Sequence, residues 1–147
     1  MADATAPDAY ARPFTPRFYE IDGQGVMFNM WYLGYVDEAM DGYLTHRGMP
    51  YAEWAELGLD VHLAHFEIDW RAPVRARDGF EVAVTTARIG KRSFTLDFAF
   101  RRGGEATATG SVVYVVVATD GSGPAPLPGR LVAALSPVAP LRGEETS

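Results

Sequence analysis

The hydrophobic pattern of this chain changes from a helical period to a strand period near its middle. Between Asn29 and Arg47, apolar residues recur three and four positions apart (Tyr32, Leu33, Val36, Ala39, Met40, Tyr43 and Leu44). This spacing places them on one broad face of a helix. Asn29 is suited to the N-cap, and Gly48 to the position after the last turn. The pattern therefore predicts one long helix with a wide buried face.

The second half of the chain alternates apolar and polar residues, which predicts antiparallel strands. In 62–70, the even-numbered residues His62 to Trp70 alternate with polar neighbours such as Glu67. Further strands are predicted over 80–89, 93–100 and 105–118, separated by connections that contain glycine. The last strand is apolar on both faces from Val112 to Val117. We therefore expect its C-terminal half to be covered on both sides.

The remaining segments are shorter or less regular. Residues 14–21 predict a first strand, with Pro13 and Pro16 indicating an edge. A helical turn is predicted after Pro50, and a short helix over 128–135. Residues 1–13 are rich in Ala, Pro and Asp and are expected to form a mobile tail, and residues 137–147 are expected to be disordered. The chain is therefore predicted to be one domain over 14–136 with two tails.

This order of elements predicts an α+β fold. One strand, one long apolar helix and four antiparallel strands follow one another along the chain. Because the helix is apolar over a wide arc, a sheet must wrap around it. The predicted architecture is a curved antiparallel sheet of about five strands around one central helix.

Composition and charge limit the classes of function that the chain can have. The chain has 147 residues, 48% of them apolar, and a net charge of −6, which argues against nucleic acid or an anionic membrane surface as the main partner. It has no cysteine, which excludes disulfides, thiolate metal sites and a cysteine nucleophile. The N-terminus lacks the features of a secretory signal, and no apolar stretch approaches membrane-spanning length. A cytoplasmic protein is the expectation.

The stretch before the helix carries the candidate chemistry. Asp22 stands in a glycine-containing turn, Asp22 to Gly25, close to the predicted helix N-terminus. Free N–H groups at a helix start can stabilise an oxyanion, and a nearby carboxylate can attack a carbonyl or activate water. An ordinary turn aspartate gives the same pattern, and from spacing alone it is the commoner case.

The same stretch resembles the signature of a known enzyme family. The residues Tyr19 to Asn29 (YEIDGQGVMFN), followed by Tyr32-Leu33, Tyr35 and Glu38-Ala39, are similar to the motif of the 4-hydroxybenzoyl-CoA thioesterases, which have the hot-dog fold. The resemblance implies hydrolysis of an acyl-CoA to the acid and free CoA. It also implies homodimers with a continuous sheet, often paired into homotetramers.

The resemblance also implies roles for individual residues. By this resemblance, Asp22 is the base or nucleophile. The backbone N–H of Asn29, with that of Phe28, is the oxyanion donor. Gly25 is the point where the chain approaches the ligand closely. Substrate contacts are implied for Val26, Phe28, Tyr32, Lys91, Arg92 and Ser93, the last three where relatives bind the phosphates of CoA. No metal or redox cofactor is implied, because CoA enters only with the substrate. Asn29 departs from the His or Tyr that many relatives carry.

The sequence supports other catalytic or ligand-binding residues less strongly than Asp22. Glu38 matches a glutamate of the family's helix motif, but Met40 stands where an arginine is usual, and a solvated helix acid is favoured. His46, His62 and His65 form no metal pattern, and the spacing of the last two predicts opposite faces of a strand. Arg101-Arg102, Arg71 and Arg75 are further, weaker candidates for phosphate contacts.

Two alternative functions stay open at this point. One is a thioesterase acting on an acyl-carrier protein, which the acidic net charge disfavours slightly. The other is a module that binds acyl-thioesters or forms oligomers without turnover. A hot-dog dehydratase is disfavoured, because it would need a histidine in the Asp22 motif and none is present.

Overall fold

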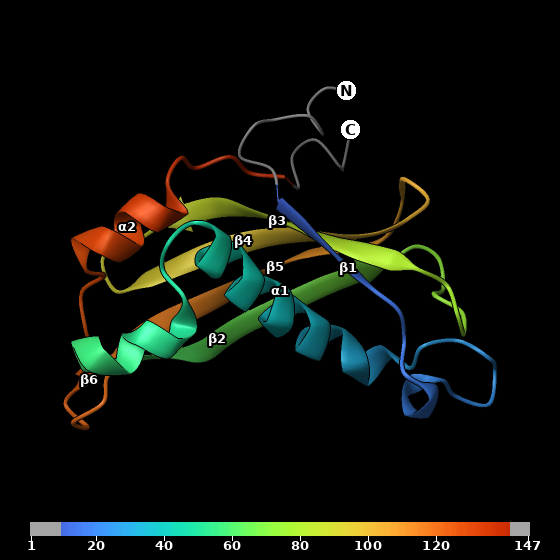
Figure 1. Cartoon of the computed structure of the whole chain (residues 1–147), viewed down its shortest axis with the longest axis horizontal. Coiled ribbons are helices and arrows are strands. Elements are labelled where there is room, and N and C mark those ends of the chain that lie inside the picture. Colours follow the sequence, from blue (N-terminus) through green and yellow to red (C-terminus); the bar gives the residue numbers. More distant parts are fainter. Residues whose placement is uncertain (1–9, 142–147) are drawn as a thin grey trace.

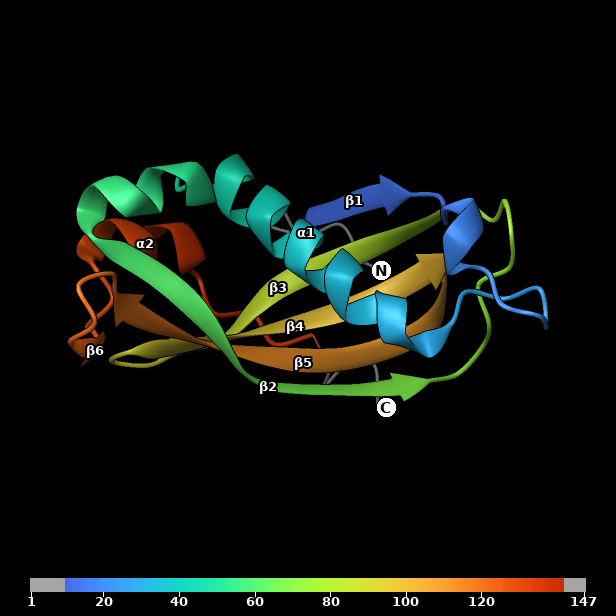
Figure 2. The ribbon, with the colours of Figure 1, turned by 90° about the horizontal axis from the view of Figure 1, so that it is seen from below.

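The computed structural model describes residues 10–141 as one curved antiparallel sheet with a helix across its concave face. The strands are β1 (Tyr10–Phe14), β2 (Leu59–Trp70), β3 (Phe80–Ile89), β4 (Ser93–Arg102), β5 (Glu105–Ala118) and β6 (Gly123–Pro124). They pair in the order β1-β3-β4-β5-β2, with β6 beside β5. Figures 1 and 2 show the helix α1 (Tyr32–His46) lying over the sheet. The predicted hot-dog architecture is confirmed.

The core lies between α1 and the inner face of the sheet. The buried residues of the helix are Tyr32, Tyr35, Val36, Ala39, Met40, Tyr43 and Leu44. They meet fully buried aromatic residues of β4, among them Phe94, Phe98 and Phe100. Each large apolar side chain buried in this way stabilises the fold by about 1.5–3 kcal/mol. The predicted helical stripe is therefore correct in its position, except that Tyr35 is buried and Leu33 only partly so.

The strand β2 contains a bulge that changes which residues face outward. Its pairing with β5 shifts between Leu63 and His65, so Ala64 is the extra residue. His62 pairs with Val115 and His65 with Val113, and both partners alternate with the buried residues of β5. The two histidines therefore share the outer face of the sheet. The expectation of opposite faces was wrong, because it assumed an unbroken alternation.

The first strand lies earlier in the chain than predicted. The strand predicted over 14–21 is instead β1 at Tyr10–Phe14, which pairs with β3, while Phe18–Glu20 forms a short 3-10 helix, η2. Tyr10 packs its ring 5.9 Å from that of Tyr43 on α1. Residues 10–13, expected in the N-terminal tail, thus belong to the sheet, and residues 1–9 lie outside the described part of the chain.

The C-terminal segment also continues further than predicted. After α2 (Gly129–Leu135), the N–H of Ala139 donates to the carbonyl of Thr86 at 2.7 Å. The N–H of Leu141 donates to the Asp97 carboxylate at 2.9 Å. Residues 137–141, expected to be disordered, are therefore bonded to the sheet. Residues 142–147 lie outside the described part.

One glycine of the sheet has no room for a side chain. A Cβ at Gly110 would lie 2.0 Å from the carbonyl oxygen of Glu67 and 2.6 Å from the ring of Phe98. Gly110 pairs with Ile68 across to β2 and with Phe98 on β4. The close approach of β2 to β5 therefore depends on the missing side chain.

The end of α1 is tied to α2 by one arginine. Arg47 donates from Nε to the carbonyl of Ala134 at 2.7 Å and from a second nitrogen to the carbonyl of Ser136. Its guanidinium also lies over the ring of Tyr43, 5.5 Å from the centroid. The helical turn predicted after Pro50 is η4 (Tyr51–Leu57), which follows α1 in the chain.

Within residues 10–141, no helix is long and apolar enough to cross a membrane.

Candidate active site

Asp22 sits on a tight turn whose ends are paired. Ile21 and Met27 form an antiparallel bridge, and inside it the N–H of Asp22 donates to the carbonyl of Val26 at 2.9 Å. The N–H of Gly25 donates back to the carbonyl of Asp22 at 3.0 Å, and Gly25 has a φ of 80°. This left-handed conformation favours glycine, so turn geometry alone explains Gly25.

The two oxygens of the Asp22 carboxylate differ in their surroundings. Oδ1 accepts the N–H of Gln24 at 2.8 Å and lies 3.4 Å from the N–H of Val26. Oδ2 has no hydrogen-bond partner among residues 10–141. One oxygen therefore fixes the side chain in the manner of a turn aspartate, while the other stays available to a ligand. The structural and the chemical interpretations of Asp22 are compatible.

The helix start offers one free backbone donor of the expected pair. A 3-10 turn, η3 (Asn29–Trp31), precedes α1, and no side chain caps either helix, so the prediction of Asn29 as N-cap was wrong. The N–H of Phe28 donates to the carbonyl of Glu20 at 2.9 Å and is therefore engaged. The N–H of Asn29 has no partner among the described residues. It begins the 3-10 turn, where the first amides have no intrahelical acceptor.

A cavity of about 460 Å³ brings most of the predicted residues together. Its walls are formed by Asp22, Gln24, Val26, Met27, Phe28, Asn29, Tyr32, Trp70, Arg71, Ala72 and Pro73. Its size is within the range of small-molecule sites. Tyr32 is buried, and burial raises the pKa of its hydroxyl, which keeps the group neutral near pH 7. Gly25 does not line the wall and acts only through the turn.

Several residues of this region, Trp70 and Glu20 among them, were not predicted as part of the site. Trp70 and Arg71 reach the cavity from the end of β2, and Trp70 meets Tyr32 edge to face at 5.8 Å. Arg71 was only a weaker candidate for phosphate contacts, and Trp70 was expected only as the end of a strand. Glu20, two residues before Asp22, is only 3% exposed. The residue pattern gave no signal for Glu20, because an acid is rarely buried and its burial is visible only in the fold.

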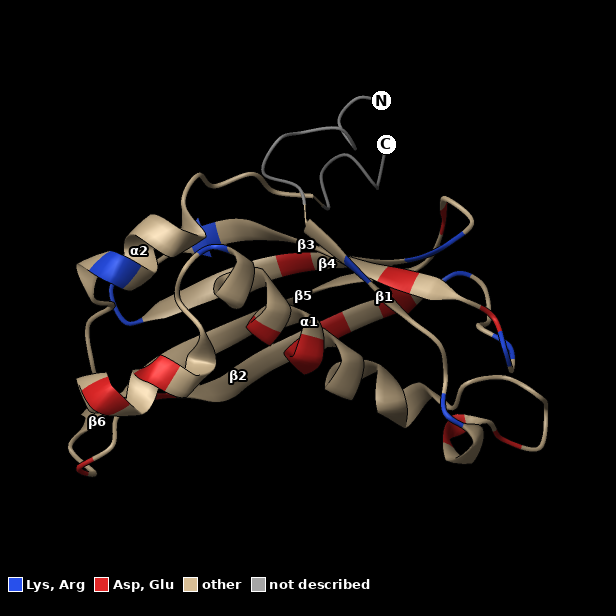
Figure 3. Ribbon diagram, viewed as in Figure 1, with Lys and Arg blue, Asp and Glu red and all other residues tan. Residues whose placement is uncertain are grey.

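The Lys91, Arg92 and Ser93 turn lies at the other end of the sheet. Ser93 pairs with Val115 of β5, whereas Trp70, beside Asp22, pairs with Ala108. Seven residues along a strand correspond to about 23 Å. The carbonyls of Lys91 and Arg92 accept N–H groups of Leu127 and Val116. Figure 3 shows basic residues at turns at both ends of the molecule. Within one copy of the chain, the turn and Asp22 are therefore not brought together.

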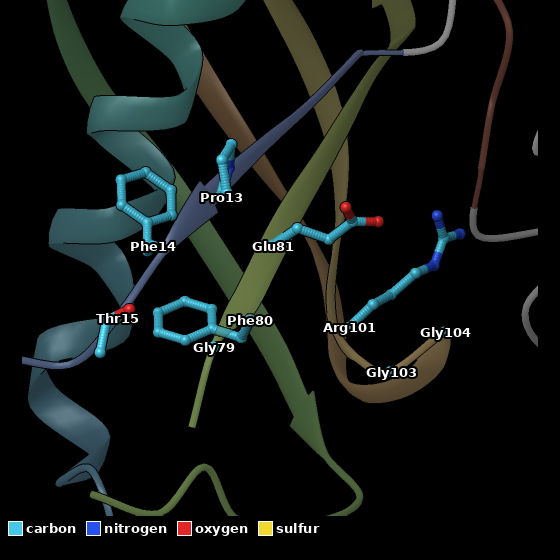
Figure 4. A pocket seen from close by; sticks show the side chains of 9 residues that line it. All are labelled: Pro13, Phe14, Thr15, Gly79, Phe80, Glu81, Arg101, Gly103 and Gly104. Carbon is cyan, nitrogen blue, oxygen red and sulfur yellow. The ribbon is translucent and has the colours of Figure 1, made fainter. Parts of the chain in front are cut away.

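A second cavity, of about 590 Å³, lies at the β1 side of the sheet, and of the predicted residues it contains only Arg101, a weaker candidate for phosphate contacts. Figure 4 shows its walls: the rings of Phe14 and Phe80, which stack at 5.8 Å, and the side chains of Glu81 and Arg101 from neighbouring strands. It contains no helix start. Among residues 10–141, no three His, Asp or Glu side chains are grouped so as to hold a metal ion.

Comparison with known proteins identifies the family. The model of the thioesterase-like superfamily matches residues 16–135. The chain belongs to the thioesterase-like superfamily. A protein of Aquifex aeolicus named "Putative esterase" is 30% identical to this thioesterase-like chain over 82 residues, which are 56% of this chain and 64% of that protein. The alignment thus spans less than two thirds of that relative.

Solved structures of thioesterases share the fold of this thioesterase-like chain. A 1,4-dihydroxy-2-naphthoyl-CoA thioesterase from Synechocystis has a TM-score of 0.79 at 21% identity, with 90% of this chain and 99% of that chain covered. A gentisyl-coenzyme A thioesterase has a TM-score of 0.80 at 22% identity, with 86% and 100% covered. At these identities the likeness shows the hot-dog fold alone.

Proposed function

We propose that this thioesterase-like chain hydrolyses an acyl-CoA thioester to the free acid and CoA, as a relative of the 4-hydroxybenzoyl-CoA thioesterases. One observation carries the proposal: the unpartnered Oδ2 of Asp22 belongs to the same cavity wall as Asn29, whose N–H is free. The names of two structural neighbours, both CoA thioesterases, support an acyl-CoA as the substrate class.

Two reaction courses use the same groups. Asp22 can attack the thioester carbon, which forms an acyl anhydride and expels the CoA thiolate, and water then hydrolyses the anhydride. Alternatively, Asp22 removes a proton from a water molecule that attacks the same carbon. In both courses the carbonyl oxygen becomes negative, and the N–H of Asn29 donates to it. The leaving thiolate takes up a proton to give free CoA.

The cavity walls suit an apolar or aromatic acyl group. Val26 and Phe28 contribute apolar surface, and Tyr32 and Trp70 contribute aromatic faces and edges. Phe28 and Trp70 are 44% and 49% exposed, so both can cover a ligand that enters. Aromatic side chains provide large contact areas at defined geometry.

A dimer through β2 would connect the two distant parts of the predicted site. β2 is a 12-residue edge strand, paired with β5 on one side only. Its Leu59 end lies near the Lys91 turn and its Trp70 end near Asp22. If β2 pairs antiparallel with β2 of a second copy, the Lys91–Ser93 turn of that copy is carried toward Asp22. We therefore propose that the phosphates of CoA are bound across a homodimer.

The test is thiol release from a panel of aliphatic and aromatic acyl-CoAs by wild type and Asp22→Asn. Asparagine keeps an oxygen that can accept from Gln24, so the turn is preserved. We expect kcat to fall by about 10³-fold, the scale of a lost catalytic acid–base group. Asp120→Asn is the matched control, because Asp120 accepts the N–H of Ser122 at 2.9 Å in an exposed turn outside the cavity. It should retain wild-type turnover.

The other outcomes lead to different functions. Turnover that survives in folded Asp22→Asn would move the chemistry to Glu38 or elsewhere. Hydrolysis of acyl-carrier protein in place of acyl-CoA would establish the carrier-protein alternative. An acyl-CoA that binds without being hydrolysed by wild type would establish a binding module.

A further inference from the structure

Glu20 is a buried acid with a complete set of partners. Its Oε1 accepts the backbone N–H of Arg17 at 2.8 Å and the hydroxyl of Tyr35 at 2.5 Å. Its Oε2 lies 3.6 Å from a guanidinium nitrogen of Arg17. The residue is only 3% exposed, and a buried carboxylate is costly unless it is paired and hydrogen-bonded. These partners are therefore what permits an acid at this position.

Its contacts join the two ends of the Asp22 turn to the central helix. The backbone carbonyl of Glu20 accepts the N–H of Phe28 at 2.9 Å, which closes the loop 20–28 just before Asn29. The side chain of the same residue reaches Tyr35, in the first turn of α1. One residue therefore links three parts: the segment before Asp22, the segment before Asn29 and the helix.

We propose that Glu20 is a positioning residue, which holds the Asp22 carboxylate and the N–H of Asn29 in one fixed arrangement through its bonds to Tyr35, Arg17 and Phe28. The proposal rests on the proposed role of Asp22. Glu20 is not among the residues that line the cavity, so it acts through the loop and not on the substrate. Small displacements of reacting groups lower rates steeply, so a residue that holds these groups in place affects kcat.

The Tyr35 hydroxyl is suited to this role because it stays protonated. Burial, followed by the hydrogen bond to Glu20, raises the pKa of Tyr35 well above that of a free tyrosine. The hydroxyl is thus a constant donor across the physiological range.

The first test compares two tyrosine variants. Tyr35→Phe removes the hydroxyl that reaches Glu20, and Tyr51→Phe removes a matched one, which donates to Asp60 at 2.5 Å at the other end of the molecule. For Tyr35→Phe we expect kcat to fall about tenfold with KM within about threefold of wild type, since positioning affects the transition state and not substrate binding. Tyr51→Phe should keep both constants.

The second test uses the conservative variant of Glu20 itself. Glu20→Gln keeps an oxygen that can accept from Tyr35 and from the N–H of Arg17, whereas Glu20→Ala keeps neither bond. We expect kcat within about threefold of wild type for the glutamine variant and about 100-fold lower for the alanine variant. If the alanine variant does not fold, the glutamine and Tyr35→Phe variants still decide the question.

Amide hydrogen exchange over residues 22–29 gives a readout that needs no turnover. We expect exchange to become about tenfold faster in Tyr35→Phe and to stay unchanged in Tyr51→Phe, because only the first loosens the loop. Unchanged exchange in Tyr35→Phe overturns the proposal, and so does faster exchange with unchanged kcat. If wild type hydrolyses no thioester, the proposed function fails, and the exchange result alone decides whether Glu20 orders the turn.

Discussion

The two ends of the sheet use their polar and apolar groups in opposite ways. At the Asp22 end, large apolar side chains face solvent, with Phe18 95% and Met30 65% exposed. At the opposite end, Arg47 is bonded to α2 and Tyr51 to Asp60. At the first end, apolar surface and one carboxylate oxygen of Asp22 have no partner among residues 10–141, while at the second end polar side chains bond to neighbouring elements. The comparison separates the proposed site from a scaffold end within one small domain.

Among the effects that test this comparison, the largest is expected at the Lys91–Ser93 turn of the scaffold end. Lys91→Ala combined with Arg92→Ala removes two cations from the scaffold end. If a dimer carries this turn to the Asp22 site of the other copy, KM for acyl-CoA should rise about 100-fold with kcat unchanged, because the phosphates are bound equally in the ground and transition states. Steady-state kinetics measures both constants. Arg130→Ala, at the same end and paired with Glu53, is the control. An unchanged KM would leave the turn as a solvated loop.

An effect of intermediate size is expected on the stability of the scaffold end, from the substitution of Arg47. Arg47→Ala leaves the carbonyls of Ala134 and Ser136 without their donors. We expect the free energy of unfolding to fall by about 2 kcal/mol, the scale of hydrogen bonds to a charged group. Urea unfolding measures this loss, and kcat well below the melting temperature should stay at the wild-type value. A fall in kcat without loss of stability would contradict the assignment of this end to the scaffold.

The smallest expected effect concerns pH. The hydroxyl of Tyr51, followed by the N–H of Val61, lowers the pKa of Asp60 below its ordinary 3.8. A lowered carboxyl pKa contributes stability above the ordinary value, and this contribution is lost as the pH falls through the lowered one. Because Asp60 is only partly buried and its charge is screened by solvent, we expect Tyr51→Phe to cost only about 0.5 kcal/mol at pH 7. Urea midpoints at pH 7 and below pH 3.8 should show the difference between variant and wild type narrowing in acid. A constant difference would exclude a charge effect.

The regular elements were predictable, because periodicity and turn residues agree there. The strands β3, β4 and β5 lie within two residues of their predicted bounds, and the glycine pair 103–104 marks the hairpin between the last two. The helix face was predicted for the same reason. In these segments local propensity and long-range burial favour the same structure.

The irregular elements were not predictable from periodicity. The alternation in β1 covers only five residues and includes Pro13, which an edge strand tolerates. The bulge at Ala64 has no turn residue to mark it, so the outward face of His65 was misjudged. At the candidate site, the sequence predicted Asp22 and Asn29, which line one cavity, but it did not predict that the N–H of Phe28 is engaged by Glu20. Hydrogen bonds between distant backbone groups depend on the folded geometry and leave no pattern along the chain.

The contact at Gly110 has a consequence for how this sequence can vary. Because a Cβ there would collide with the backbone of β2, the neighbouring strand would have to move away from β5 to admit even alanine. That strand is also the free edge proposed to meet a second copy. A single atom at Gly110 would therefore disturb the internal sheet and the proposed assembly together. Substitutions can accumulate at the solvent-facing positions nearby, but position 110 accommodates only glycine without a shift of the strands.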